Sequence, residues 1–304
     1  MSLTKKLAIK TPSAEQVLTP KWATDSNIHL SVKRDDLIHP VISGNKWRKL
    51  KYALIEAEKH KVKHIGSFGG GFSNHLHALG FCCHQLNIQL TAIVRGDYSH
   101  NLTPMLQDLM SWKTDIQYVD KATYSKRNDT EYLQTIKQNS ADVLIIPEGG
   151  SQQQALRGVK EIVSELTHNY DYIMAPVASG GTLAGLINGV AKYCPNTKII
   201  GVGVLKGQGY LEELVHTLLP AEIKNTANWR INHDYHFGGY AKSNNELNQF
   251  CEAFFQQTQV QIEPVYSGKL MFAIQALASQ GFFPTNSRVL ALHTGGLQGA
   301  RQKN

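Results

Sequence analysis

The chain has 304 residues, of which 42% are hydrophobic and 18% charged, a composition typical of a folded protein with a substantial core. No apolar run approaches the roughly 20 residues that a membrane helix requires, and the N-terminal stretch lacks the apolar core of a secretory signal. The formal charge of +7 raises nucleic acid as a partner, but the lysines are mostly scattered singly among acidic residues. We therefore expect neither a nucleic-acid nor a membrane partner.

The cysteines and histidines give little support for a metal site. No C-x-x-C pair is present, and the adjacent Cys82 and Cys83 suit neither a disulfide framework nor zinc. His75 and His77 point apart on a helix and no carboxylate accompanies them, so we predict no metal. A reduced, cytoplasmic setting is the simplest interpretation.

From residue 63 onward, short apolar runs alternate with helical patterns. Helices are expected after residue 43, from residue 73 to 86, around residues 105–112, and where Leu156, Val159, Val163 and Leu166 share a face. Strands are predicted at residues 64–68, 90–94, 115–119, 143–146, 172–177, 199–204 and 289–292. This alternation predicts an α/β fold with largely parallel sheets, in which ligands lie beyond the carboxyl ends of the strands.

The segment SGNKWRKLKYALIEAEKH predicts an amphipathic helix whose first turn carries Lys46, with Lys49 one turn further on. Ser43 or Asn45 can cap this helix. Partial burial and a second nearby cation favour a neutral lysine, the form that Schiff-base chemistry needs. The helix N-terminus and Lys49 also suit an anion such as phosphate. The alternative is an ordinary basic, solvated helix face.

Two glycine-rich segments follow predicted strands. In FGGGFSNH the glycines form a turn, and Ser73 and Asn74 open a helix whose free amides suit a carboxylate. In ASGGTLAG, Ser179 to Thr182 lead into a helix and form a cradle for a single phosphate, because the spacing of a dinucleotide or NTP loop is missing. Both segments can equally be turns that serve packing alone.

The segment EPVYSGK and the strand end HTGG supply hydroxyl groups. Tyr266 can donate or accept a proton, and Ser267 and Thr294 carry neutral hydroxyls. Each of them can also be an ordinary loop residue.

Seven segments in order, VKRDDL, SGNKWRKLKYAL, GGGFSNH, PEGGS, ASGGTLAGL, EPVYSGK and LHTGG, resemble the 1-aminocyclopropane-1-carboxylate deaminase and D-cysteine desulfhydrase family. Its members are pyridoxal 5'-phosphate (PLP) enzymes with the tryptophan synthase β-like fold. The resemblance implies two open, twisted, mostly parallel sheets covered by helices, with PLP in the cleft between two domains. We expect residues 1–49 plus 156–304 to form the large domain and residues 50–155 a smaller inserted one. A homodimer is also implied.

The resemblance assigns roles to individual residues. Lys46 matches the lysine that binds the cofactor covalently, and Asn74 the residue beside its 3-oxygen. Ser73, with Asn74 and His75, matches the seat of the substrate carboxylate. Tyr266 matches a catalytic tyrosine, and Tyr240 a second one. The remaining expected cofactor contacts are Lys49, Ser179, Gly180, Gly181, Thr182, Ser267 and Thr294.

Two positions depart from the family pattern. Ser267 replaces the glutamate that ring-opening deaminases place near the pyridine nitrogen, and Phe72 replaces a common glutamine. A hydroxyl stabilises a pyridinium less than a carboxylate does, which favours β-elimination over ring opening. We predict α,β-elimination of a small D-amino acid to a keto acid and ammonia. The alternatives are a 1-aminocyclopropane-1-carboxylate deaminase and a PLP-binding or ligand-binding protein with little turnover.

Overall fold

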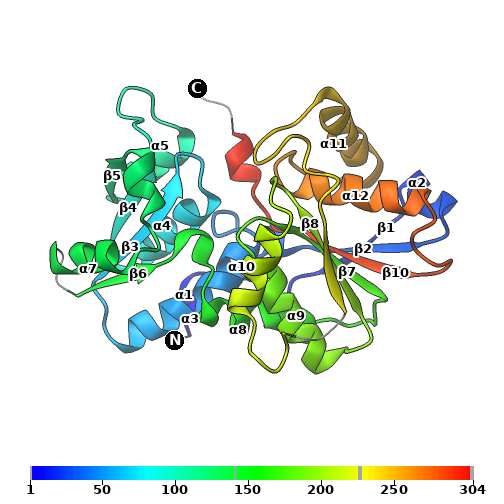
Figure 1. Ribbon diagram of the computed structural model, residues 1–304, viewed down its shortest axis with the longest axis horizontal. Coiled ribbons are helices and arrows are strands. Elements are labelled where there is room, and N and C mark those ends of the chain that lie inside the picture. The colour runs from blue at the N-terminus through cyan, green and yellow to red at the C-terminus, as the bar shows by residue number, and fades with distance from the viewer. Residues whose placement is uncertain (1, 140–141, 225–227, 302–304) are drawn as a thin grey trace.

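The computed structural model describes residues 2–139, 142–224 and 228–301, and within them the strands form two sheets (Figure 1). The larger sheet has six strands, and all neighbouring pairs are parallel except β1 with β2. In spatial order its strands are β1 (Glu15–Leu18), β2 (His29–Lys33), β10 (Arg288–Leu292), β7 (Tyr172–Val177), β8 (Lys198–Gly203) and β9 (Trp229–Asn232).

The smaller sheet is entirely parallel and has four strands among the described residues. Its spatial order is β5 (Asp115–Val119), β4 (Gln89–Arg95), β3 (His64–Gly70) and β6 (Val143–Ile146). The alternation of apolar strands with amphipathic helices produces this arrangement, because each parallel strand needs a crossover helix before the next one.

Helices cover both faces of each sheet. On the large sheet, one apolar cluster joins α2 (Lys21–Asp25), α11 (Asn245–Thr258) and α12 (Ser267–Ser279), and another joins α8 (Gln153–Ser164), α9 (Gly181–Tyr193) and α10 (Tyr210–Leu218). The small sheet is covered by α3 (Asn45–Lys59), α4 (Asn74–Leu86) and α5 (Pro104–Ser111) and by α6 (Lys121–Ser125) and α7 (Thr130–Asn139). The remaining helical segments are α1 (Leu3–Lys6), η1 (Asp35–Leu37), η2 (Glu148–Gly150) and η3 (Leu297–Ala300).

The predicted α/β class and its seven strands are confirmed, most with ends that differ by a residue or two. The turn predicted at Gly69 and Gly70 is wrong, because both residues continue β3. A Cβ at Gly69 would lie 2.7 Å from atoms of Leu76 and Ser73, so glycine there allows α4 to pack closely on the strand. Leu166 lies two residues beyond the end of α8 at Ser164.

The expected domain boundaries at residues 50 and 155 both fall inside helices, in α3 and α8. These two helices are in close contact, since a Cβ at Gly158 would lie 1.9 Å from the Arg48 carbonyl oxygen. All strands of the small sheet lie between residues 64 and 146, and the division into domains stays a prediction. No helix among the described residues has the length and apolarity needed to cross a membrane.

Candidate active site

Helix α3 begins against the loop that follows β10. Its N-cap is Gly44, with φ of 71°, and not Ser43 or Asn45 as the sequence suggested. A Cβ at Gly44 would lie 1.8 Å from the Thr294 carbonyl oxygen, so only glycine fits this contact. The Asn45 side chain is used elsewhere: its Nδ2 donates to Thr182 Oγ1 (2.7 Å), and its Oδ1 accepts from Lys46 Nζ (2.8 Å).

Two lysines of α3 lie close together without a carboxylate partner. Burial lowers the pKa of Lys46 to about 8, against a smaller raising effect of Glu263. Lys49 is 2% exposed, and burial, with the nearby Lys46 charge, lowers its pKa well below the usual value. Neither lysine forms an ion pair within the part of the chain that the structure describes. Such a pair of cations, one half-buried and one buried, favours an anionic ligand.

The Lys49 ammonium lies in a cradle of neutral oxygens. Its Nζ donates to the Gly149 carbonyl oxygen (2.6 Å), Ser151 Oγ (2.9 Å) and Ser179 Oγ (3.2 Å). Helix α9 starts beside it, after Gly180 in the left-handed region with φ of 74°. The ammonium, the hydroxyls and the N-terminus of a 13-residue helix together fit a phosphate group.

The N-terminus of α4 supplies the second predicted anion seat. Ser73 is its N-cap, as expected, and the Ser73 Oγ accepts from the Leu76 amide (3.2 Å). The His75 side chain turns toward the sheet, where Nε2 lies 2.8 Å from Ser67 Oγ. Ser67 Oγ donates to the Ile146 carbonyl oxygen, so it accepts from His75.

His75 is therefore held in one tautomer. Its Nδ1 is a buried acceptor that has no hydrogen-bond partner among the described residues. Burial lowers the pKa of His75 well below its usual value, and the charges of Lys46 and Lys49 add to this effect. The imidazole is neutral at physiological pH and lies beside Gly150, next to the Lys49 cradle.

The two predicted tyrosines contact each other directly. The hydroxyls of Tyr240 and Tyr266 lie 2.8 Å apart, and their rings meet edge to face. Lys269, which is fully buried, fixes the Tyr240 loop by donating to the carbonyl oxygens of His236 and Gly239 (both 2.8 Å). Burial raises the pKa of Tyr266 well above its usual value, so its hydroxyl keeps its proton at neutral pH.

Glu263 is a site residue that the sequence did not predict. Its carboxylate is 3% exposed and accepts from the backbone amides of Val265 (2.6 Å), Tyr266 (3.0 Å) and Ser267 (2.9 Å). Burial nevertheless raises the pKa of Glu263 to about 7. The available signal was its place four residues before Ser267, the first residue of α12.

The Ser267 hydroxyl is occupied by the same carboxylate. Ser267 Oγ donates to Glu263 Oε1 (3.1 Å) and accepts from the Glu263 amide (2.9 Å). A carboxylate thus stands directly beside the position where the sequence offered only a hydroxyl.

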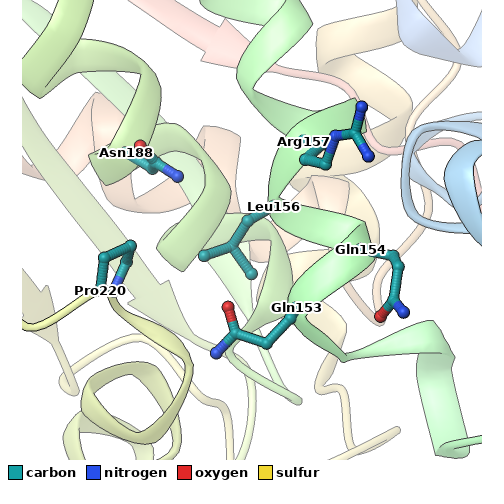
Figure 2. Close-up of a pocket in the computed structure, with 6 residues that line it drawn as sticks. All are labelled: Gln153, Gln154, Leu156, Arg157, Asn188 and Pro220. Atoms are coloured by element: carbon teal, nitrogen blue, oxygen red, sulfur yellow. The ribbon is translucent and has the colours of Figure 1, made fainter.

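Two of the hollows on the described part of the molecule differ in size, and the smaller one adjoins the site. It has a volume of about 90 Å³, and its walls include Ser43, Asn74 and Gly296. The larger one, about 370 Å³, is lined by side chains of α8 and α9 and by Pro220, with Leu156 at its centre (Figure 2). None of its lining residues is a predicted site residue, so we assign it no part in the chemistry.

The predicted site residues are connected by contacts. Asn45 links Lys46 to Thr182, Lys49 contacts Ser179, and Tyr240 contacts Tyr266. Asn74 and Glu263 both lie against Gly296, which follows Thr294. Phe72 is 47% exposed at the end of the glycine-rich segment.

The family model for "Pyridoxal-phosphate dependent enzyme" matches residues 10–295. The chain belongs to this family. Its cofactor is pyridoxal phosphate, and the residues present fit it: Lys49 and the start of α9 offer a phosphate cradle, and Lys46 offers an amine with a lowered pKa.

Two relatives of this chain carry the same enzyme name, and one solved structure is a homologue of that enzyme. The chain is 29% identical to a predicted 1-aminocyclopropane-1-carboxylate deaminase of Pyrococcus furiosus, over 88% of this chain and 84% of that protein. It is 28% identical to a protein of the same name from Thermotoga maritima, over 89% of each chain. The crystal structure of an ACC deaminase homologue superposes with a TM-score of 0.81 at 25% identity, covering 98% of this chain and 96% of the other.

Proposed function

We propose that this PLP-dependent enzyme deaminates a small amino acid by α,β-elimination, with a D-amino acid such as D-cysteine as substrate. The observation that carries the proposal is the pair of lysines on α3, Lys46 half-buried and Lys49 buried, which form no ion pair with a carboxylate within the described residues. One lysine suits covalent attachment of the cofactor and the other suits its phosphate. The configuration of the substrate rests on the family resemblance.

The pKa directions of Lys46 and Tyr266 decide which of the two groups can act as the base. When bound, PLP supplies an electron sink that acidifies the Cα–H bond of the substrate. Lys46, with a pKa of about 8, is neutral often enough at physiological pH to accept that proton. Tyr266 has a pKa well above its usual value, so it keeps its proton and is a hydrogen-bond donor rather than a base. We therefore assign the base to Lys46, and to the Tyr266–Tyr240 pair a hydrogen bond that stabilises the departing β-substituent.

The substrate carboxylate is assigned to the N-terminus of α4 at Ser73 and Asn74, where free amides and the helix dipole favour a negative charge. The β-substituent leaves with the electrons of its Cβ bond, as thiolate or hydroxide. Addition of one water gives the keto acid and ammonia. Phe72 offers an exposed apolar ring beside this seat and favours a small, uncharged β-substituent.

Ring opening of 1-aminocyclopropane-1-carboxylate is a second candidate, and Glu263 favours it. The sequence argued against ring opening because Ser267 replaces a glutamate. Glu263 brings a buried carboxylate to the Ser267 hydroxyl (3.1 Å), so this argument loses much of its weight. The names of the relatives point the same way.

Absorption spectra of the PLP-loaded protein with D-cysteine, D-serine, L-cysteine and 1-aminocyclopropane-1-carboxylate test the proposal. We expect D-cysteine to perturb the visible band and to release pyruvate, ammonia and sulfide in equal amounts. Release of 2-oxobutanoate from the cyclopropane substrate alone would establish ring opening instead.

Lys46→Ala, with Lys51→Ala as the matched control on the same helix, tests the assignment of the base. Lys51 pairs with Glu161 (2.7 Å), so its loss should leave turnover unchanged. Turnover by Lys46→Ala at the rate of the unchanged protein would show that the lysine is wrongly assigned.

A further inference from the structure

The C-terminal turn η3 contacts the Asn74 side chain. It follows β10 of the large sheet and lies between the two sheet-containing halves of the molecule (Figure 1). Gln298 Nε2 donates to Asn74 Oδ1, and Gln298, like Asn74, lines the 90 Å³ hollow. No sequence motif included Gln298, yet its only side-chain donor bond within the described residues is to a predicted cofactor residue.

Arg301 in turn contacts Gln298, and its guanidinium is held by residues of helices that cover the small sheet. Arg301 Nη2 donates to Asp108 Oδ2 (2.6 Å) on α5, and His77 Nε2 of α4 lies 2.8 Å from the same oxygen. Arg301 Nη2 also donates to Gln298 Oε1 (3.2 Å), and Arg301 Nε to the Gln298 carbonyl oxygen (3.2 Å).

These contacts have a fixed direction. A guanidinium only donates, so the oxygen of the Gln298 amide must face Arg301 and its nitrogen must face Asn74. The oxygen of Asn74 then accepts, and its Nδ2 is left as the donor on the other side. Asn74 Nδ2 makes no hydrogen bond within the described residues and lies beside Gly296, where a Cβ would come within 3.1 Å of it.

We propose that Gln298 is a positioning residue: together with Arg301 it fixes the Asn74 amide so that an N–H, and not the carbonyl oxygen, faces the cofactor's 3-oxygen. An amide free to rotate presents its oxygen to that site part of the time and repels a negatively charged 3-oxygen. This inference rests on the proposed function and on the family resemblance, which sets Asn74 beside the cofactor's 3-oxygen.

A double-mutant cycle on the PLP-loaded protein tests the proposal, using the unchanged protein, Gln298→Met, Asn74→Ala and the double variant. The readouts are the dissociation constant of PLP and the pH midpoint of the visible cofactor band. We expect Gln298→Met to weaken PLP binding about threefold to tenfold, the effect of one neutral hydrogen bond. The pH midpoint should rise, because the negatively charged form of the cofactor loses a donor.

The decisive result is non-additivity. If Gln298 acts through Asn74, the double variant matches Asn74→Ala in both readouts. If Gln298 merely holds the two halves of the molecule together, Gln298→Met has the same effect in both backgrounds, and the proposal is overturned. Gln154→Met, at an exposed glutamine of α8, is the matched control and should change neither readout.

The failure of this inference and that of the proposed function are distinguishable. An Asn74→Ala variant with an unchanged band would contradict the role of Asn74 itself. A shifted Asn74→Ala with an unchanged Gln298→Met would overturn only the role of Gln298. Should Gln298→Met not fold, Arg301→Met replaces it in the cycle: a raised midpoint that vanishes in the Asn74→Ala background supports the proposal, and no shift overturns it.

Discussion

Helix α3 carries two adjacent buried cations, Arg48 and Lys49, in opposite electrostatic surroundings. Arg48 is fully buried and pairs with Asp35 (3.0 Å) and Glu165 (2.5 Å). Lys33 lies 3.7 Å from the same Glu165. Lys49 is almost equally buried, yet it meets only hydroxyls and a carbonyl oxygen.

The pKa directions express this difference. Burial lowers the pKa of Arg48, but Asp35 and Glu165 outweigh it, so the net shift is upward. Burial lowers the pKa of Lys49 and no acidic group opposes it. The charge of Arg48 is balanced by Asp35 and Glu165 without a ligand, whereas the charge of Lys49 is balanced only when an anion binds. Of these two buried cations, the one that suits an anionic ligand is the one whose counter-charge is absent.

The largest expected effect on stability comes from the cluster of Arg48 with Asp35 and Glu165. Arg48→Met leaves the buried Asp35 and the partly buried Glu165 without their main partner, which should lower the free energy of unfolding by about 3–5 kcal/mol. Lys51→Met is the control, because the Lys51–Glu161 pair is partly exposed and worth less than about 1 kcal/mol. Urea denaturation of both variants measures the difference. Equal losses would mean that the Arg48 cluster does not stabilise the fold.

Glu263 is the acidic counterpart of Lys49, a buried charge without an ion pair within the described residues. Its pKa is raised from 4.5 to about 7, so its contribution to stability is full below pH 4.5 and is lost as the pH rises through 7. The loss amounts to at most about 3 kcal/mol. Glu263→Gln should flatten the dependence of the unfolding free energy on pH across this window. A dependence as steep as that of the unchanged protein would assign it to other groups.

The fold could be predicted from the sequence largely because its signals are local. Apolar runs between helical patterns predicted all four strands of the small sheet and the inner strands β7, β8 and β10 of the large one. The strands at or near the edges of the large sheet, β1, β2 and β9, were not predicted, since short polar-rich runs such as EQVL and WRIN show no clear period. The N-cap of α3 was predicted wrongly for a different reason. Gly44 is required by the Thr294 carbonyl oxygen, a contact made by the far end of the chain.

The residues of the candidate site differ in the same way, because some have a local sequence signal and others depend on distant contacts. Glycines and hydroxyls after strands predicted Ser73 and Ser179, and the short segment EPVYSGK predicted Tyr266. Glu263 and Gln298 stayed hidden, because their importance depends on contacts that only the folded chain creates.

Removing the charge of Lys49, which forms no ion pair within the described residues, should have effects of opposite sign on stability and on PLP binding. Lys49→Met removes a buried charge that only a ligand balances, so the PLP-free protein should unfold with an unchanged or higher free energy, by up to about 2 kcal/mol. PLP binding should weaken about tenfold to hundredfold through the loss of a charge-assisted hydrogen bond. Thermal unfolding and PLP titration measure the two. A PLP-free protein destabilised like Arg48→Met would erase the distinction between the two cations.

The smallest expected effect concerns the ionisation of Lys46, which lies close to Lys49. In the proposed function, attachment of PLP requires the neutral form of Lys46, so the rate at which the visible band forms should rise with pH to a midpoint near 8, rather than near the usual 10.5. The Glu263 carboxylate favours the Lys46 ammonium, so Glu263→Gln should lower this midpoint by less than about one unit. Glu161→Gln, which alters the partner of Lys51, should leave it unchanged. A midpoint near 10.5 in the unchanged protein would show that burial does not tune Lys46 and that this lysine carries an ordinary charge.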